Sequence, residues 1–144
     1  RLGKIKFFDP ACGSGNFLII AYKAIRELEI EIWERIKTLQ GGQSEFPFSN
    51  ITLQQFYGIE IDEYACDTAT LSLWLSEHPM NNKFHERLGT RPDALPLRPS
   101  GHIVCGNACR LDWNTVCPHT ADEEVYVMGN PPYLGTRNQN LFCL

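Results

Sequence analysis

The sequence predicts an α/β fold, in which a parallel β-sheet carries helices on both of its faces. Three observations carry this prediction. Short apolar runs alternate along the chain with amphipathic segments of helical spacing. The first apolar run passes through a glycine-rich turn directly into a helical segment, and no internal repeat or low-complexity tract interrupts the order. Strands that alternate with helices in this way are typical of parallel, doubly wound sheets.

The first expected strand covers residues 4–8 (KIKFF) and runs into a turn at Asp9-Pro10. A long amphipathic helix is expected from Asn16 to the glycine pair at Gly41-Gly42. Its apolar residues recur at helical spacing and are placed on the buried face: Phe17, Leu18, Ala21, Ile25, Leu28, Ile32 and Ile36. Its charged residues are placed on the opposite, solvent-facing side: Lys23, Arg26, Glu27, Glu34 and Arg35.

Residues 56–61 (FYGIEI) are the second expected strand. Asp62 can cap a second helix, which is expected to stop before Pro79. The apolar residues of this helix are Tyr64, Ala65, Ala69, Leu73 and Leu75.

The third and fourth strands are expected over residues 102–105 (HIVC) and 125–128 (VYVM). A long loop that holds Pro92, Pro96 and Pro99 precedes the third strand, and Gly129-Asn130-Pro131-Pro132 follows the fourth.

The composition fits a soluble globular domain. The chain has 144 residues, enough for one core, with 43% hydrophobic and 21% charged residues. No apolar stretch approaches the ~20 residues that a membrane-spanning helix needs, and no signal peptide is visible. The first and last residues suggest a fragment of a longer chain. We therefore expect a cytoplasmic protein.

The six cysteines do not follow the spacing of a secreted disulfide scaffold or of a zinc site. Only Cys105 and Cys109 come near metal-ligand spacing, with Cys117 and His119 further on. We expect reduced thiols and no metal site.

The formal net charge of −4 is unusual for a complete nucleic-acid-binding protein, because phosphate contacts come from Lys and Arg. Either the partner is not a nucleic acid, or the basic surface lies outside these residues.

Residues 9–17 (DPACGSGNF) form a glycine-rich turn between the first strand and the first helix. Such a turn lets the backbone approach a nucleoside ligand closely. The dinucleotide pattern G-x-G-x-x-G is absent, and no Lys follows to hold a phosphate. A ligand with a ribose and a cationic amino-acid end therefore fits better than a pyrophosphate, with Asp9 placed to meet the ammonium group. A simple tight turn is the alternative.

Two further polar positions follow strands. Glu60 ends the second strand, where a carboxylate can accept both ribose hydroxyls. Asp62 has the same charge, but a helix cap explains it equally well. Asn107, after the third strand, can read an adenine edge through its amide, although a turn-forming Gly-Asn pair explains it equally well.

The tetrapeptide Asn130-Pro131-Pro132-Tyr133 follows the fourth strand. An aromatic amine is a poor nucleophile, because its lone pair is delocalised into the ring. Two acceptors aimed at its two N–H groups would free that lone pair, and Asn130 Oδ1 with the Pro131 carbonyl can supply them. Tyr133 offers a flat face on which a base rotated out of a duplex can stack. A surface turn with two prolines is the alternative.

Taken in order, the segments DPACGSGNF, GIEID, GNA and NPPY resemble the amino-methyltransferases of DNA. The stretches DEYACDTATLSLWLSEHPMN and GNPPYLGTRNQ resemble, more particularly, bifunctional type II restriction–modification polypeptides. The resemblance covers essentially the whole chain. It implies a partial Rossmann-like class I methyltransferase fold, in which residues 1–144 are part of the catalytic domain. An upstream segment, later strands and a target-recognition domain would then lie outside the chain.

The resemblance further implies direct transfer of a methyl group from S-adenosyl-L-methionine to the exocyclic amine of adenine in double-stranded DNA. The cysteines are then not nucleophiles. Too few residues separate Asp9 from Asn130 to house a recognition domain, and the subgroup with this motif order is mostly adenine-specific. The implied catalytic residues are Asn130, Pro131, Pro132 and Tyr133. The implied cofactor-binding residues are Asp9, Ala11, Cys12, Gly13, Gly15, Asn16, Phe17, Glu60, Ile61, Asn107 and Ala108.

DNA would be bound largely by regions outside this chain, which agrees with its acidic balance, and the fragment alone is expected to be inactive. No metal and no membrane partner are implied. Methylation of the cytosine N4 amine is a close alternative. Methylation of a glutamine side chain in a protein poses the same problem of a planar nitrogen, but Asp9-Pro10-Ala11-Cys12 resembles the DNA enzymes more. A degenerate scaffold that only binds cofactor is a non-enzymatic alternative.

Overall fold

The computed structural model describes residues 1–41, 47–90 and 101–131. Its sheet has four parallel strands in the order β3-β2-β1-β4. The strands are β1 (Lys6–Asp9), β2 (Phe56–Glu60), β3 (His102–Cys105) and β4 (Val125–Val127). Phe8 on β1 lies opposite Tyr57 on β2 and Val127 on β4. The predicted parallel sheet is confirmed.

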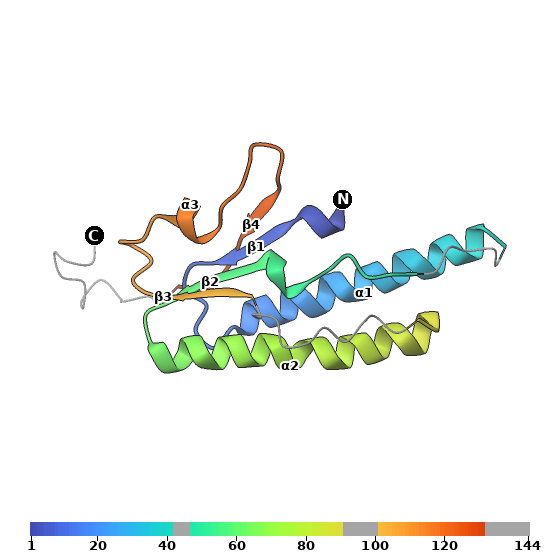
Figure 1. The fold of residues 1–144 in the computed structure, drawn as a ribbon, viewed down its shortest axis with the longest axis horizontal. Helices are drawn as coiled ribbons and strands as arrows, with labels where there is room; N and C mark the ends of the chain where they lie inside the picture. Colours follow the sequence, from blue (N-terminus) through green and yellow to red (C-terminus); the bar gives the residue numbers. More distant parts are fainter. Residues whose placement is uncertain (42–46, 91–100, 132–144) are drawn as a thin grey trace.

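The two long helices, α1 (Asn16–Leu39) and α2 (Glu63–Leu88), lie side by side on one face of the sheet (Figure 1). The short helix α3 (Trp113–Val116) packs against β2 on the other face. This arrangement follows from the strand order, because crossover connections between parallel strands are right-handed. The first two crossovers step in one direction along the sheet, and the third steps back past β1. Helices on both faces are thus confirmed, with unequal coverage.

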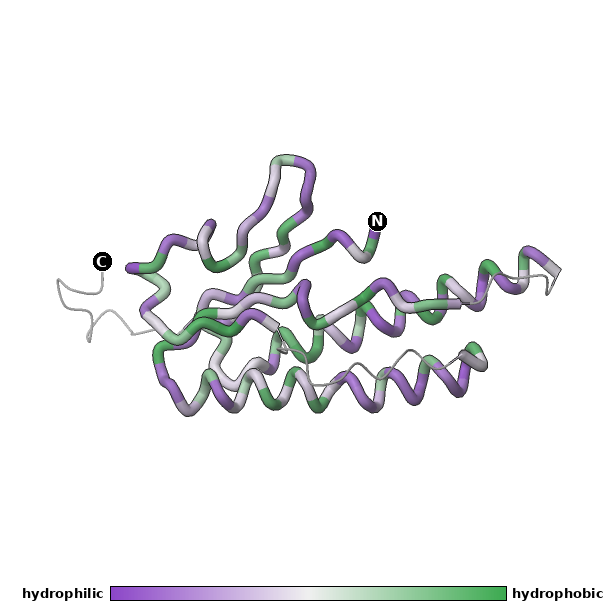
Figure 2. The backbone as a smooth tube through the Cα atoms, viewed as in Figure 1, coloured by the Kyte–Doolittle hydropathy of each residue, from purple (hydrophilic) through white to green (hydrophobic). Residues whose placement is uncertain are grey.

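The hydrophobic core has two parts, one on each face of the sheet. The larger part lies between the sheet and the long helices and includes Leu18, Tyr22, Phe56 and Leu73. The smaller part, on the α3 side, is built from Phe8, Tyr57, Ile59 and Cys117. Figure 2 shows hydrophobic residues along the strands and mixed hydropathy along both long helices. Two single-turn helices, η1 (Leu2–Lys4) and η2 (Leu53–Gln55), precede β1 and β2.

The predicted buried face of α1 is partly wrong. Phe17, Leu28 and Ile32 are 46%, 42% and 40% exposed, whereas Arg26, which was placed toward solvent, is only 2% exposed. The buried positions of α1 are Leu18, Tyr22, Arg26, Glu29 and Ile30. The helix is therefore rotated relative to its apolar pattern.

A polar network explains why charged residues of α1 are buried. Arg26 donates to Ser49 Oγ at 2.7 Å and to Asn81 Oδ1 at 3.0 Å. Glu29 accepts from Ser49 Oγ at 2.6 Å and from the Asn50 N–H at 2.7 Å. A buried charge is tolerated only when it is paired and hydrogen-bonded, and this network supplies both conditions. It also fixes the chain before β2 against the two long helices.

The predicted end of α2 before Pro79 is wrong, because the helix continues through Pro79 to Leu88. Proline in a helix removes one backbone hydrogen bond. Here Met80, Phe84 and Leu88 are buried one turn apart beyond it, and their packing stabilises the extension. Gly89 ends the helix with φ of +79°, a left-handed cap. The predicted Asp62 cap is confirmed: its side chain accepts the Ala65 N–H at 2.8 Å.

Two apolar residues assigned to α2 are exposed, namely Tyr64 at 81% and Leu75 at 54%. Helix α3 was not predicted. Within the described residues, no helix is both long enough and apolar enough to cross a membrane.

Candidate active site

The predicted site residues gather at the edge of the sheet where the strands end. Asp9 is the last residue of β1 and Glu60 the last of β2, and Asn130 follows β4 by three residues. β1 lies between β2 and β4, so the connections after β1 and β4 leave the sheet around one point. Ligands of open α/β sheets bind at such a switch point, outside the carboxyl ends of the strands. The fold thus joins motifs that are up to about 120 residues apart in sequence.

Asp9 is completely buried at this edge. Its Oδ1 accepts the N–H of Ala11 at 3.0 Å, whereas its Oδ2 is buried and has no hydrogen-bond partner among the described residues. Burial raises the pKa of the Asp9 carboxyl above its ordinary value of 3.8, the Ala11 N–H partly opposes this, and the nearby charge of Glu60 raises it further. An unpaired buried carboxylate oxygen is costly unless a cation meets it.

Gly129, directly after β4, lies against the Asp9 side chain. A Cβ atom at Gly129 would stand 2.9 Å from Asp9 Cγ and still closer to Oδ1. The Met128 N–H also donates to the carbonyl of Phe8 at 2.9 Å, which ties the end of β4 to β1. The segment that carries Asn130 is therefore held beside Asp9, and only a residue without a side chain allows that approach.

Glu60 connects the end of β2 with the glycine-rich turn. Its Oε2 accepts the Gly13 N–H at 2.9 Å, and its Oε1 accepts the N–H groups of Ile61 at 2.7 Å and Asp62 at 3.0 Å. Charge-assisted bonds of this kind fix a carboxylate in one orientation. A carboxylate has about four acceptor sites, so capacity remains for a hydroxyl donor.

The two predicted glycines of the turn have different roles. Gly13 has φ of +54°, and a Cβ atom there would meet nothing within 4 Å, so the space beside it is open. Gly15 has φ of +83° and precedes α1, and a Cβ atom there would stand 3.2 Å from that of Ala69 on α2. Gly13 can therefore admit a ligand, whereas Gly15 allows the start of α1 to pack on α2.

Cys12, which was also predicted to bind the cofactor, stabilises the glycine-rich turn through its backbone hydrogen bonds. Its N–H donates to the Ile59 carbonyl at 3.0 Å, and its carbonyl accepts the Gly15 N–H at 2.8 Å. Its buried sulfur occupies the space where a side chain of Gly58 would be. Burial, with the charges of Asp9 and Glu60, raises the pKa of the Cys12 thiol to about 12, so it is not a nucleophile at neutral pH.

Asn107 lies in the turn after β3. Its Oδ1 accepts the Cys109 N–H at 2.9 Å, and its carbonyl accepts from Arg110 and Leu111. This is the turn-forming geometry that the sequence left open, and it uses the oxygen of the Asn107 side-chain amide. Ala108 in the same turn is partly exposed.

Sequence reasoning missed Trp113, the first residue of α3. Its Nε1–H donates to the Ala108 carbonyl at 2.8 Å, and its ring contacts that of Phe8 edge-on at 5.3 Å. Phe8 directly precedes Asp9. Trp113 therefore links the Asn107–Ala108 turn to the strand that carries Asp9. Helix α3 has only 4 residues, too few for a repeating apolar pattern that would have marked Trp113 in the sequence.

The remaining predicted residues are solvent-accessible or lie outside the described residues. Asn16, Phe17 and Ile61 are exposed, Phe17 at 46% and Ile61 at 68%. Asn130 and Pro131 are exposed as well. Pro132 and Tyr133 lie outside the described residues.

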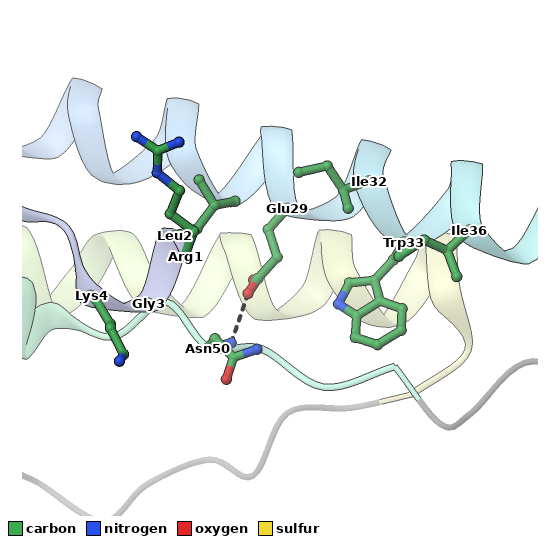
Figure 3. A pocket seen from close by; sticks show the side chains of 9 residues that line it. All are labelled: Arg1, Leu2, Gly3, Lys4, Glu29, Ile32, Trp33, Ile36 and Asn50. Atoms are coloured by element: carbon green, nitrogen blue, oxygen red, sulfur yellow. Dashed lines mark hydrogen bonds between the residues drawn. The ribbon is translucent and has the colours of Figure 1, made fainter.

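A hollow of about 640 Å³ lies elsewhere, between η1 and α1, where Glu29 accepts the Asn50 N–H (Figure 3). Leu2, Trp33 and Ile36 contribute to its wall. Because η1 precedes β1 and Asp9 ends it, this hollow is at the opposite end of that strand, and no predicted site residue lines it. The described residues contain no group of three or more His, Cys, Asp or Glu that could hold a metal ion.

The chain is similar to known DNA methyltransferases and restriction–modification enzymes. DNA methyltransferase A of Bacillus subtilis (strain 168) is 55% identical over 142 residues, which are 97% of this chain and 16% of that protein. A putative type II restriction enzyme and methyltransferase of Methanocaldococcus jannaschii, RM.MjaORFECS2P, is 37% identical over 108 residues, 75% of this chain and 9% of that protein.

A solved structure of the type IIL restriction–modification enzyme MmeI, in complex with DNA, superposes with a TM-score of 0.81 at 39% identity. The match covers 98% of this chain and 19% of that one. The chain thus spans less than a fifth of the length of each of these proteins. Residues 1–141 match the profile of the MmeI DNA-methyltransferase domain. The chain belongs to the family of MmeI-type DNA-methyltransferase domains.

Proposed function

We propose that this chain forms the cofactor-binding and catalytic part of a restriction–modification enzyme. That enzyme transfers a methyl group from S-adenosyl-L-methionine to the exocyclic amine of adenine in double-stranded DNA. The observation that carries the proposal is the contact between Gly129 and the buried Asp9, because it sets the Asn130 segment beside a carboxylate that lacks a partner. We propose a cytoplasmic location, as for DNA-modifying enzymes that act inside the cell.

The residues at the sheet edge fit this cofactor. The unpartnered Asp9 Oδ2 requires a cationic or hydrogen-bond-donating group, and an amino-acid ammonium is both. The open space beside Gly13 leaves room for the chain that joins such an ammonium to a ribose. Glu60 is already oriented by three backbone N–H groups and keeps acceptor capacity for a ribose hydroxyl.

The adenine end of the cofactor would lie between the exposed side chain of Ile61 and the Asn107–Ala108 turn. An exposed branched apolar residue offers a face for a purine ring. The amide NH₂ of Asn107 and the Ala108 backbone can supply polar contacts to its edge. Phe17 and Asn16, at the exposed start of α1, are the remaining proposed cofactor-binding residues, and they directly follow the glycine-rich turn.

When bound, S-adenosylmethionine supplies an electrophilic methyl group. Asn130 Oδ1 and the Pro131 carbonyl accept the two N–H bonds of the target amine and so increase the electron density on its nitrogen. Pro131 and Pro132 restrict the backbone, and Tyr133 stacks on the extruded base. Catalysis then rests on positioning two reactants and on acceptors that face the developing positive charge.

The relatives support DNA as the substrate, because the named ones are DNA methyltransferases or restriction–modification enzymes and MmeI was solved with DNA. The net charge of −4 supports the proposal that other parts of such a protein contribute most of the DNA contacts.

The test is to identify the product base. DNA is incubated with the complete protein and labelled S-adenosylmethionine, digested to nucleosides and separated by liquid chromatography with mass spectrometry. We expect the label in N6-methyladenine. Label in N4-methylcytosine would show that the target base is cytosine and not adenine. Label in protein alone would show that DNA is not the substrate.

A further inference from the structure

Two cysteines that the proposed chemistry does not use lie beside Glu60. Cys105 ends β3 and lies opposite Glu60 in the register of β2 and β3. Cys66 lies in the first turn of α2, and its thiol donates to the Glu60 carbonyl at 3.3 Å. The Cys105 thiol donates to the next carbonyl, that of Ile61, at 3.7 Å. Both thiols therefore contact consecutive carbonyls of the same segment, those of Glu60 and Ile61.

The two thiols differ in their access to solvent. Cys105 is exposed, whereas Cys66 is buried. Burial, together with the hydrogen bond to Cys105, raises the pKa of the Cys66 thiol to about 12. An oxidant therefore reaches Cys105 first.

We propose that Cys66 and Cys105 are a reversible disulfide-forming site, oxidised by a peroxide, that controls the position of Glu60. The Cys105 thiolate attacks one peroxide oxygen, which gives a sulfenic acid and hydroxide. That hydroxide takes the proton of the Cys66 thiol, and the resulting thiolate attacks the Cys105 sulfur and displaces a second hydroxide. In total, two thiols lose two protons and two electrons, and one hydrogen peroxide becomes two water molecules.

The site matters because both sulfurs contact the backbone that carries the candidate ribose carboxylate. Oxidation removes the hydrogen bond from the Cys66 thiol to the Glu60 carbonyl and ties the first turn of α2 to the end of β3. Glu60 also holds the turn at Gly13. The proposed loss of cofactor affinity on oxidation rests on the proposed function, whereas disulfide formation does not.

The chain provides a matched control, because Cys109 is also an exposed free thiol and lies four residues from Cys105. Both are on the tryptic peptide 88–110, and Cys66 is on peptide 38–83. The complete protein is treated with hydrogen peroxide, blocked, digested without reductant and analysed by mass spectrometry. We expect peptides 38–83 and 88–110 joined and two hydrogens lighter than their sum. The product should persist in Cys109→Ser and disappear in Cys105→Ser.

A linked product that persists in Cys105→Ser, or Cys105 oxidised only to sulfinic acid, would overturn the disulfide site. Calorimetric titration with S-adenosylhomocysteine then compares oxidised and reduced protein. We expect binding about fivefold weaker after oxidation, the change expected for one ordinary hydrogen bond, and recovered with dithiothreitol. Unchanged affinity in fully linked protein would overturn control of Glu60. Absence of binding by the reduced protein would contradict the proposed function and leave the disulfide result standing.

Discussion

The Cα of Gly129 lies so close to the Asp9 carboxylate that no side chain fits between them. This contact places the residue before the proposed catalytic tetrapeptide, Gly129, against the proposed ammonium partner of the cofactor, Asp9.

Replacement of Gly129 by alanine is expected to destabilise the protein and to weaken cofactor binding. The new Cβ must displace Asp9, whose Oδ1 is held by the Ala11 N–H. Overpacking of this kind costs about 1–3 kcal/mol of the free energy of unfolding. Thermal unfolding of the complete protein measures the loss. Gly41→Ala is the control, because Gly41 also has a positive φ, of +63°, but no atom lies within 4 Å of its new Cβ. Equal losses for both variants would argue against the Asp9 contact.

The affinity for S-adenosylhomocysteine is expected to rise with pH as Asp9 ionises. Burial raises the pKa of the free Asp9 carboxyl above 3.8, and a bound ammonium would lower it again, so binding releases a proton. The affinity for S-adenosylhomocysteine therefore increases with pH, from about pH 4 up to and through the raised pKa of the Asp9 carboxyl in the free protein. Asp9→Asn should remove this part of the pH dependence. Identical pH profiles for the two proteins would exclude Asp9 as the ammonium partner.

The same substitution is expected to stabilise the protein without ligand at neutral pH. The pKa of the Asp9 carboxyl is higher in the folded protein than in the unfolded chain. Ionisation of Asp9 therefore lowers the free energy of unfolding; this loss is absent below pH 3.8 and complete above the folded pKa. Asparagine has no charge to desolvate at any of these pH values. Urea unfolding at pH 7 tests this, and a lower free energy of unfolding for Asp9→Asn would contradict it.

Trp113→Phe is expected to weaken cofactor binding several-fold while leaving the rate at saturating cofactor nearly unchanged. Phenylalanine retains a ring against Phe8 but loses the donor to the Ala108 carbonyl, a bond worth about 1 kcal/mol. Steady-state kinetics separate KM from kcat. Trp74→Phe is the control, since Trp74 on α2 is 38% exposed, close to the 41% of Trp113. A fall in kcat with unchanged KM would assign Trp113 another role.

Asn130→Ala is expected to abolish methyl transfer and to leave cofactor binding nearly intact. Its amide oxygen is one of two proposed acceptors, and its side chain is exposed at the sheet edge. Single-turnover transfer of labelled methyl to DNA gives the rate of the chemical step, with Asn114→Ala on α3 as the control. A variant that retains more than about a tenth of the rate, a loss below ~1.4 kcal/mol in the barrier, would rule out the role.

Much of the fold was predictable because its signals are local. The strands at 6–9 and 56–60, the helix start at Asn16 and the Asp62 cap depend on short runs and on turn residues. The gathering of Asp9, Glu60 and Asn130 also followed, because parallel strands bring their carboxyl ends to one edge.

What was not predictable depends on tertiary contacts. Pro79 marks the end of an isolated helix, but buried Met80 and Phe84 stabilise its continuation. Arg26 was assigned to solvent because its acceptors, Ser49 and Asn81, are distant in sequence.

The candidate site also has features that the sequence did not predict because they depend on tertiary contacts. The separation of 39 residues between Cys66 and Cys105 gave no sign that both thiols contact the Glu60–Ile61 backbone, because the register of β2 and β3 and the start of α2 bring them there. The turn-forming role of the Asn107 side chain and the support of that turn by Trp113 likewise depend on contacts that form only in the folded protein.

The most direct test of the account is calorimetric titration of the complete protein with S-adenosylhomocysteine, for the wild type, Glu60→Gln and Glu63→Gln. Glutamine keeps the size of Glu60 but loses the charge that orients it toward three backbone N–H groups. Glu63, exposed on the first turn of α2, is the matched control. We predict saturable binding by the wild type and by Glu63→Gln, and binding at least about tenfold weaker, or ~1.4 kcal/mol, for Glu60→Gln. No binding by the folded wild type, or equal binding by all three, would contradict the assignment of this sheet edge as the cofactor site.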